Sequence, residues 1–229
     1  MKGRSKCLSC GEALRPSDLI PVLSYVLLRG KCRYCSSRFG ISALFIEIGY
    51  GLVFVALYQT ILKGQESILH SFGWLVYYSA LFIVLGVMAL YDKAHTYIPL
   101  SFLSAYSLLT LGMFGLQVLT DTSIAIITAP FVVSLPFFMI WMITRGRGVG
   151  FGDVVLFFGV GAFFGLVEGL AVFVLSVWMG ALVGVYFKYF AHDGSYKKQV
   201  LPFVPFIVFA FIIVLFTGID VVSIAMMFA

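Results

Sequence analysis

The sequence predicts an all-α polytopic membrane protein of about seven transmembrane helices with a small N-terminal four-cysteine head. Of its 229 residues, 62% are hydrophobic and only 11% are charged, whereas a soluble domain is about half apolar and about one quarter charged. The apolar residues form continuous runs near the roughly 20 residues that a helix needs to cross about 30 Å of hydrocarbon. The runs do not alternate, so they indicate helices rather than the strands of a barrel.

The chain divides at residue 40 into two predicted domains. Residues 1–40 are polar and basic and contain all four cysteines, and residues 41–229 carry the apolar runs. The predicted spans are 41–62, 71–91, 98–119, 123–143, 149–167, 170–190 and 201–219. The fifth is the weakest, because it is rich in glycine and has an acid near each end, Asp153 and Glu168.

The basic residues predict the orientation of the spans. Fourteen of the 15 Lys and Arg residues fall before the first span or in even-numbered connections, and Lys63 alone falls on the other side. Cytoplasmic segments carry such an excess, so the N-terminus is predicted to be cytoplasmic. This placement accounts for the net charge of +5. The expected partner of these charges is therefore membrane lipid and not nucleic acid.

The four cysteines form two pairs, CLSC (Cys7, Cys10) and CRYC (Cys32, Cys35). Two CxxC pairs separated by 21 residues are close to the spacing of a four-cysteine zinc site. Two disulfides are the alternative, but a reducing cytosol argues against them. Because no coordination position would stay open, we expect a structural zinc that orders a segment too short for its own core.

An apolar stretch, DLIPVLSYVLLRG, lies between the two cysteine pairs. It is bounded by Asp18 and Arg29 and is too short to span a bilayer. We expect it to pack on the membrane surface or against the helical bundle.

Four acids lie in or at the ends of the apolar runs: Glu47, Asp92, Asp153 and Glu168. Asp92 ends the second predicted span and Asp153 begins the fifth. The intervening chain crosses the membrane twice, so both carboxylates are expected near the cytoplasmic face. Acids in spans are costly and usually functional. Glu168 is expected at the external interface, in a structural role.

Two neighbouring carboxylates in a poorly solvated site share a proton, so one can take a proton from water while the other donates to a carbonyl oxygen. Asp92 and Asp153 are therefore the predicted catalytic residues of a membrane peptidase. Gly150 and Gly152 precede Asp153 and would let a substrate backbone approach closely. A proton- or ion-coupled transporter is the alternative reading of two intramembrane acids beside a glycine-broken helix.

Several motifs resemble those of known membrane proteases. Gly150-Phe151-Gly152-Asp153 resembles the GxGD motif of intramembrane aspartyl proteases. Asp92 followed by Ile98-Pro99 resembles the D-x5-IP pattern of type IV prepilin peptidases. The stretch from Leu14 to Cys35 is similar to the segment between their CxxC pairs, and Glu47 in FIEIG fits a glutamate that follows it. A late PFVPF stretch at residues 202–206 resembles their PFGPF-like motif, with Val204 replacing the small residue.

The resemblance implies an enzyme of the bacterial cytoplasmic membrane that removes the short basic leader from prepilins or pseudopilins. Asp92 and Asp153 fall on the family's two aspartate positions, and Glu47 is expected to bind substrate or a methyl donor. Many members of this family also methylate the new amino terminus with S-adenosylmethionine. The sequence departs from the family pattern at SRFGISALFIE, where an Arg-Tyr-Pro sequence is common.

Overall fold

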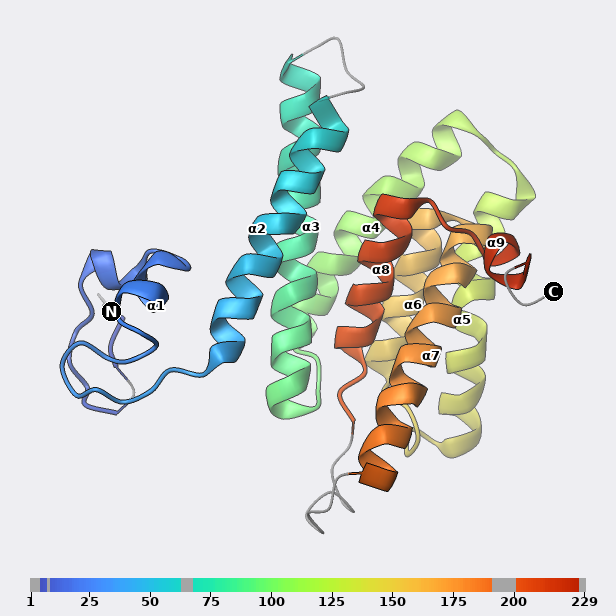
Figure 1. Ribbon diagram of the computed structural model, residues 1–229. Coiled ribbons are helices and arrows are strands. Elements are labelled where there is room, and N and C mark those ends of the chain that lie inside the picture. Colours follow the sequence, from blue (N-terminus) through green and yellow to red (C-terminus); the bar gives the residue numbers. More distant parts are fainter. Residues whose placement is uncertain (1–4, 8, 63–67, 191–200, 227–229) are drawn as a thin grey trace. The chain divides into compact units, whose positions relative to one another are not determined.

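The computed structural model describes residues 5–7, 9–62, 68–190 and 201–226. Apart from two isolated β-bridges, the regular structure of these residues is helical (Figure 1). The chain separates into two compact units, residues 1–71 and 72–229. Five basic residues used to predict orientation lie outside the described residues: Lys2, Arg4, Lys63, Lys197 and Lys198.

The first unit joins a small head to one long helix. Antiparallel bridges join Lys6 to Ala13 and Lys31 to Arg38. Between them lie a 3-10 helix, η1 (Pro16–Leu19), and a single short helix, α1 (Leu23–Leu27). Helix α2 (Ile41–Leu62) follows and contains a candidate membrane span, Leu44–Ile61. The predicted domain boundary at residue 40 thus falls just before α2, although α2 groups with the head. The division into two domains stays a prediction.

Most of the described helices belong to the second unit. They are α3 (Ile68–His95), whose first residues fall in the first unit, α4 (Leu100–Thr120), α5 (Ile124–Thr144), α6 (Phe151–Phe164), α7 (Leu166–Phe190), α8 (Val204–Thr217) and α9 (Val221–Met226). Helices α3, α4, α5 and α7 are candidate spans, which with α2 makes five. Each predicted span has a matching helix, but α6 and α8 are shorter apolar helices of 14 residues.

The fifth and sixth predicted spans meet at a different residue from the one expected. The helices are separated at Gly165, which has φ +80° and ψ −163°, a conformation essentially restricted to glycine. Glu168 therefore lies in the first turn of α7 rather than between two helices. Helix α9 was not predicted, because six residues are too few to give a periodic signal.

Helix α6 is the centre of the second unit and packs against α4, α5 and α7. Eight of its 14 residues are buried, so it carries Asp153 on a rigid element. A Cβ placed on Gly161 would lie 2.6 Å from the carbonyl oxygen of Ala129 in α5. A Cβ on Gly159 would likewise overlap the ring of Tyr106 in α4. The two glycines let α6 approach its neighbours more closely than any other residue would allow.

Aromatic rings from three other segments pack around Phe157, which lies one turn after Asp153 in α6. The Phe157 ring centroid lies 4.5 Å from that of Phe137 in α5 and 5.4 Å from that of Phe173 in α7. Phe203, which precedes α8, lies 5.3 Å from Phe137 and 6.3 Å from Phe157. This cluster fixes the start of α8 beside the start of α6.

Candidate active site and metal site

The four predicted metal ligands lie together. The sulfur atoms of Cys7, Cys10, Cys32 and Cys35 are all within 4.8 Å of one another. The Sγ atoms of Cys7 and Cys35 are 3.9 Å apart, close to the roughly 3.8 Å that two thiolates at about 2.3 Å from a tetrahedral zinc would show. All four are free thiols, so the two-disulfide alternative does not describe this structure. The cluster could bind a metal such as zinc.

The two cysteine pairs are held by matching backbone turns. Cys7 N–H donates to Glu12 O at 2.9 Å, and Cys32 N–H donates to Ser37 O at 2.8 Å. The Cys7 carbonyl accepts from Gly11 N–H at 2.9 Å, and the Cys32 carbonyl accepts from Ser36 N–H at 3.0 Å. The left-handed residue of the first turn is Gly11, with φ +73°, and its counterpart is Ser36, with φ +57°. The second turn therefore places a non-glycine residue where glycine is favoured.

Two of the four cysteines have surroundings that favour the thiolate form, whereas the pKa of Cys10 is raised to about 11 because the backbone N–H of Glu12, which lowers it, is outweighed by desolvation and the neighbouring Cys35 and Cys7. The backbone N–H of Cys10, with that of Ser9, lowers the pKa of Cys7 to about 6. The Ser37 hydroxyl and N–H lower the pKa of Cys35. Because thiolates and not thiols are metal ligands, the head has the donor chemistry of a zinc site.

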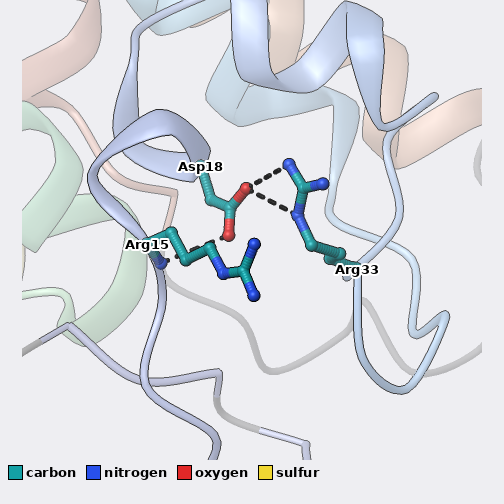
Figure 2. Close-up of polar contacts among 3 residues, drawn as sticks. All are labelled: Arg15, Asp18 and Arg33. Atoms are coloured by element: carbon teal, nitrogen blue, oxygen red, sulfur yellow. Dashed lines mark hydrogen bonds and ion pairs between the residues drawn. The ribbon is translucent and has the colours of Figure 1, made fainter.

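A carboxylate links the apolar stretch of the head to the second cysteine turn (Figure 2). Nε and Nη2 of Arg33 donate to Oδ1 of Asp18 at 3.0 and 2.7 Å, and the Arg15 N–H donates to Oδ2 at 3.2 Å. The Arg33 side chain holds the pKa of Asp18 below its ordinary value. The Asp18 side chain is only 2% exposed and that of Arg33 is 42% exposed. This pair fixes η1 to the second cysteine turn.

Glu47, predicted to bind substrate or a methyl donor, lies in the second turn of α2. Its Oε2 accepts a hydrogen bond of 2.7 Å from the backbone N–H of Val22. Val22 precedes α1 and has φ +62°, which is rare for a β-branched residue. The carboxylate thus joins the head to α2 across 25 residues.

Asp92 lies near the C-terminal end of α3 and is 7% exposed. Its Oδ2 accepts a hydrogen bond of 3.0 Å from the backbone N–H of Val204, the first residue of α8. The first N–H groups of a helix lack partners within it and favour negative charge. Asp92 therefore meets the unpaired amide end of α8.

Asp153 is the third residue of α6, and Gly150 is the N-cap of that helix. The Asp153 carboxylate is held beside the Gly150 backbone and is close enough to Asp92 to interact with its charge. A Cβ on Gly152 would lie 3.0 Å from Cδ1 of Ile98, which follows α3. The ends of α3, α6 and α8 thus bring both aspartates into one region of the second unit.

Gly150 and Gly152 have different surroundings. The nearest side-chain atom to a Cβ on Gly150 is the Oδ2 of Asp153, at 3.5 Å. Gly152 is covered by Ile98. Of the two glycines, Gly150 is therefore the better placed to let a substrate backbone come close to the chain beside Asp153.

The sequence did not single out two further features of this region. The Val204 amide faces Asp92, and a backbone N–H has no signature in a sequence. An aromatic cluster is formed by residues on both sides of Asp92 in the sequence: the hydroxyls of Tyr91 and Tyr97 are 2.6 Å apart, and the His95 ring centroid lies 4.5 Å from that of Tyr91. The sequence does contain one signal for this cluster: Tyr91 and His95 are four residues apart, a spacing that places two helical residues side by side.

The family model described as the bacterial peptidase A24 N-terminal domain matches residues 1–61. The prepilin leader peptidase/N-methyltransferase of Bacillus subtilis (strain 168) is 31% identical over 227 residues, which cover 96% of this chain and 84% of the relative. The proteins of that name from Vibrio cholerae and Pseudomonas putida are 25% and 26% identical, over 93% and 90% of this chain and 81% and 69% of their own. No solved structure matches. The chain therefore belongs to the peptidase A24 (prepilin leader peptidase) family.

Proposed function

We propose that this chain is a membrane aspartyl endopeptidase that cleaves the leader of type IV prepilins or pseudopilins, with Asp92 and Asp153 as the catalytic pair. One observation carries the proposal. Two acids separated by 60 residues of sequence lie where the ends of α3, α6 and α8 meet, in a chain whose relatives are named prepilin leader peptidases.

The chemistry requires one ionised and one protonated carboxylate. The ionised carboxylate removes a proton from water as the water oxygen attacks the scissile carbonyl carbon. The protonated carboxylate donates its proton to the carbonyl oxygen, which gives a neutral tetrahedral intermediate. Its collapse breaks the C–N bond: the carboxyl that took the proton from water gives it to the leaving amine, and one hydroxyl of the intermediate returns its proton to the other carboxylate as the carbonyl re-forms. The pair again shares one proton afterwards, as two close carboxylates do.

The short helices offer water and substrate a route to the pair. In the proposed topology of seven spans with a cytoplasmic N-terminus, α6 and α8 both start on the cytoplasmic side. Fourteen residues extend only about 21 Å, less than the roughly 30 Å of hydrocarbon. A recess at their starting ends would put Asp153 and the amide of Val204 below the cytoplasmic surface of a bacterial inner membrane, within reach of the leader.

We also propose roles for residues outside the catalytic pair. The cysteine cluster would hold zinc for structure only, because four thiolates leave no open coordination position. Gly150 would face the substrate backbone. Glu47 stays a predicted substrate-binding residue. The names of the relatives include N-methyltransferase, so methylation of the new amino terminus with S-adenosylmethionine is proposed as a second activity.

Purified protein in detergent, without any ion gradient, should cut a synthetic prepilin segment on the cytoplasmic side of its apolar helix. Mass spectrometry of the products, with and without S-adenosylmethionine, reads leader removal and methyl addition separately. Asp92→Asn and Asp153→Asn should each lower cleavage by at least about 10²-fold, because each removes one proton-transfer group.

Glu168→Gln is the matched control, because it changes an acid in the first turn of α7 that has no role in the proposed chemistry. Full cleavage by either aspartate variant would refute the catalytic assignment. A protein that never cleaves but carries protons or ions in liposomes, and loses that transport in the same two variants, would be the transporter of the alternative reading.

A further inference from the structure

The head carries an apolar surface that no described part of its own unit covers. No apolar residue of η1 or α1 is buried. Five large apolar side chains on these elements or between them are about half exposed or more: Leu19 (50%), Ile20 (45%), Leu23 (49%), Val26 (61%) and Leu27 (71%). We call these five residues the apolar face. Five exposed large apolar side chains within nine residues of sequence indicate a contact with another apolar phase.

The hydrogen bond from Val22 to Glu47 fixes the level of the apolar face along α2. Glu47 is three residues beyond Leu44, where the candidate span begins, or about 4.5 Å along the helix axis. Val22 lies between Ile20 and Leu23 in the sequence, and its N–H is 2.7 Å from the Glu47 carboxylate. The apolar face is therefore held level with the first turn of the span. Interfacial segments bury their apolar side about 5–10 Å into the headgroup and acyl boundary.

Charge at the edges of the apolar face fits a lipid surface. Arg15 precedes η1 and Arg29 follows α1, and both are exposed. The one acid between them, Asp18, is already neutralised by Arg33. Exposed arginines beside an apolar segment can keep their charge among lipid headgroups while their stems lie along apolar surface, and they favour anionic lipids.

We propose that the apolar face is inserted into the headgroup boundary of the bilayer, with anionic lipid as its partner, and that Glu47 is the clip that holds it there. The occupant is lipid because lipid surrounds the first turn of a spanning helix, which is the level that Glu47 fixes. The clip also accounts for Val22, whose unusual φ of +62° points its N–H at the carboxylate. This proposal does not depend on the peptidase activity.

The test places a diazirine amino acid at position 27 of the full chain, in nanodiscs of mixed phosphatidylcholine and phosphatidylglycerol. After illumination, mass spectrometry identifies what the residue has captured. We expect phospholipid adducts as the main product. The matched control is the same amino acid at position 36, which is exposed in a cysteine turn and should capture several-fold less lipid. Adducts from position 27 that fall mainly on residues 72–229 would overturn the proposal, since the apolar face would then cover the bundle. Capture of water alone would also overturn it.

Two further comparisons test separately the hydrogen bond of Glu47 and the attraction of Arg15 and Arg29 to anionic lipid. Glu47→Leu should lower lipid capture at position 27 several-fold, whereas Glu47→Gln keeps an acceptor oxygen and should retain most of it. Unchanged zinc content shows that the head is still folded in both. Equal capture in Glu47→Leu would refute the clip. Removing phosphatidylglycerol should lower the yield, and Arg15→Gln with Arg29→Gln should reproduce that loss in mixed lipid. A yield independent of both would refute the role of anionic lipid.

Discussion

Substituting Gly161 by alanine should destabilise the second unit because α6 and α5 touch through their backbones at this point. A Cβ on Gly161 would lie 2.6 Å from the carbonyl oxygen and 2.9 Å from the carbonyl carbon of Ala129, and 2.8 Å from Cα of Pro130. All three atoms belong to the backbone, so no side-chain rotation relieves the overlap. One helix has to move.

The expected cost follows from the size of that movement. Ordinary carbon contacts begin at about 3.5 Å, so α6 and α5 must separate by close to 1 Å. Overpacking costs about 1–3 kcal/mol, and because every overlapping atom of α5 belongs to the backbone we expect the upper part of this range, about 2–3 kcal/mol. The gain of about 1 kcal/mol that alanine usually brings to a helix offsets part of this. We expect a net loss of about 1–2 kcal/mol, and a fall in Tm on the order of 5 °C for a unit of this size.

The measurement is thermal unfolding of both proteins in one detergent, followed by the cleavage assay. Gly112→Ala is the matched control. Gly112 also lies within a helix, α4, and a Cβ there would meet no atom within 4 Å. Its Tm should stay constant or rise slightly. Because the shift of α6 also displaces Asp153, Gly161→Ala should cleave more slowly at temperatures where it remains folded. An unchanged Tm in Gly161→Ala, or an equal loss in Gly112→Ala, would refute the close backbone approach.

Three other changes have defined outcomes. Ser36→Gly removes a left-handed non-glycine residue from the second cysteine turn. The relief of about 1–2 kcal/mol, less the roughly 0.5–1 kcal/mol of chain entropy that glycine costs, should stabilise the head by about 0.5–1 kcal/mol, seen as a higher chelator concentration needed to release zinc. Gly11→Ala should do the reverse. Tyr106→Phe removes the buried hydroxyl that donates to the Leu156 carbonyl at 3.0 Å and should cost about 0.5–1.5 kcal/mol, read from the Tm. Chelation of the metal should expose residues 5–40 to proteases, because the cluster supplies the order that this short segment lacks; undiminished protection would contradict a structural metal.

The helices were predictable because each apolar run had few ways to satisfy its backbone in lipid. The places where the prediction differs depend on local backbone geometry. Gly165 separates α6 from α7 through a conformation that only glycine readily adopts. The sequence around it contains many glycines, and nothing in composition distinguishes this one from Gly161, which lies inside a helix. Only the three-dimensional contacts separate a glycine that ends a helix from one that lets two helices touch.

The site was predictable where side chains carry the information. Four cysteines in CxxC pairs predicted a cluster, and the structure gathers their sulfur atoms. Counting membrane crossings put Asp92 and Asp153 on one face. The partners of the carboxylates were not predictable, because they are backbone N–H groups. Val22 faces Glu47, and Val204 faces Asp92. An amide donor is common to every residue except proline, so only the fold reveals which amide an acid will meet.

The position of both aspartates at helix ends decides how their variants must be designed. Asp92 accepts from the first N–H of α8, and Asp153 lies at the N-terminal turn of α6 beside Gly150. Asp92 therefore supplies an acceptor to the amide end of α8, and Asp153 places a carboxylate in the first turn of α6. Removing such a group would cost about 0.3–2 kcal/mol of stability whether or not it is catalytic. An alanine variant would remove the acceptor at the helix end and the proton-transfer group together, so its loss of cleavage would not distinguish the two roles. Asparagine keeps an acceptor oxygen and is itself a good cap, but it cannot exchange a proton. If an aspartate is catalytic, its asparagine variant should keep a Tm near that of the parent protein and should lose cleavage. If cleavage falls only in proportion to lost Tm, Asp92 and Asp153 serve the fold and the active site must lie elsewhere.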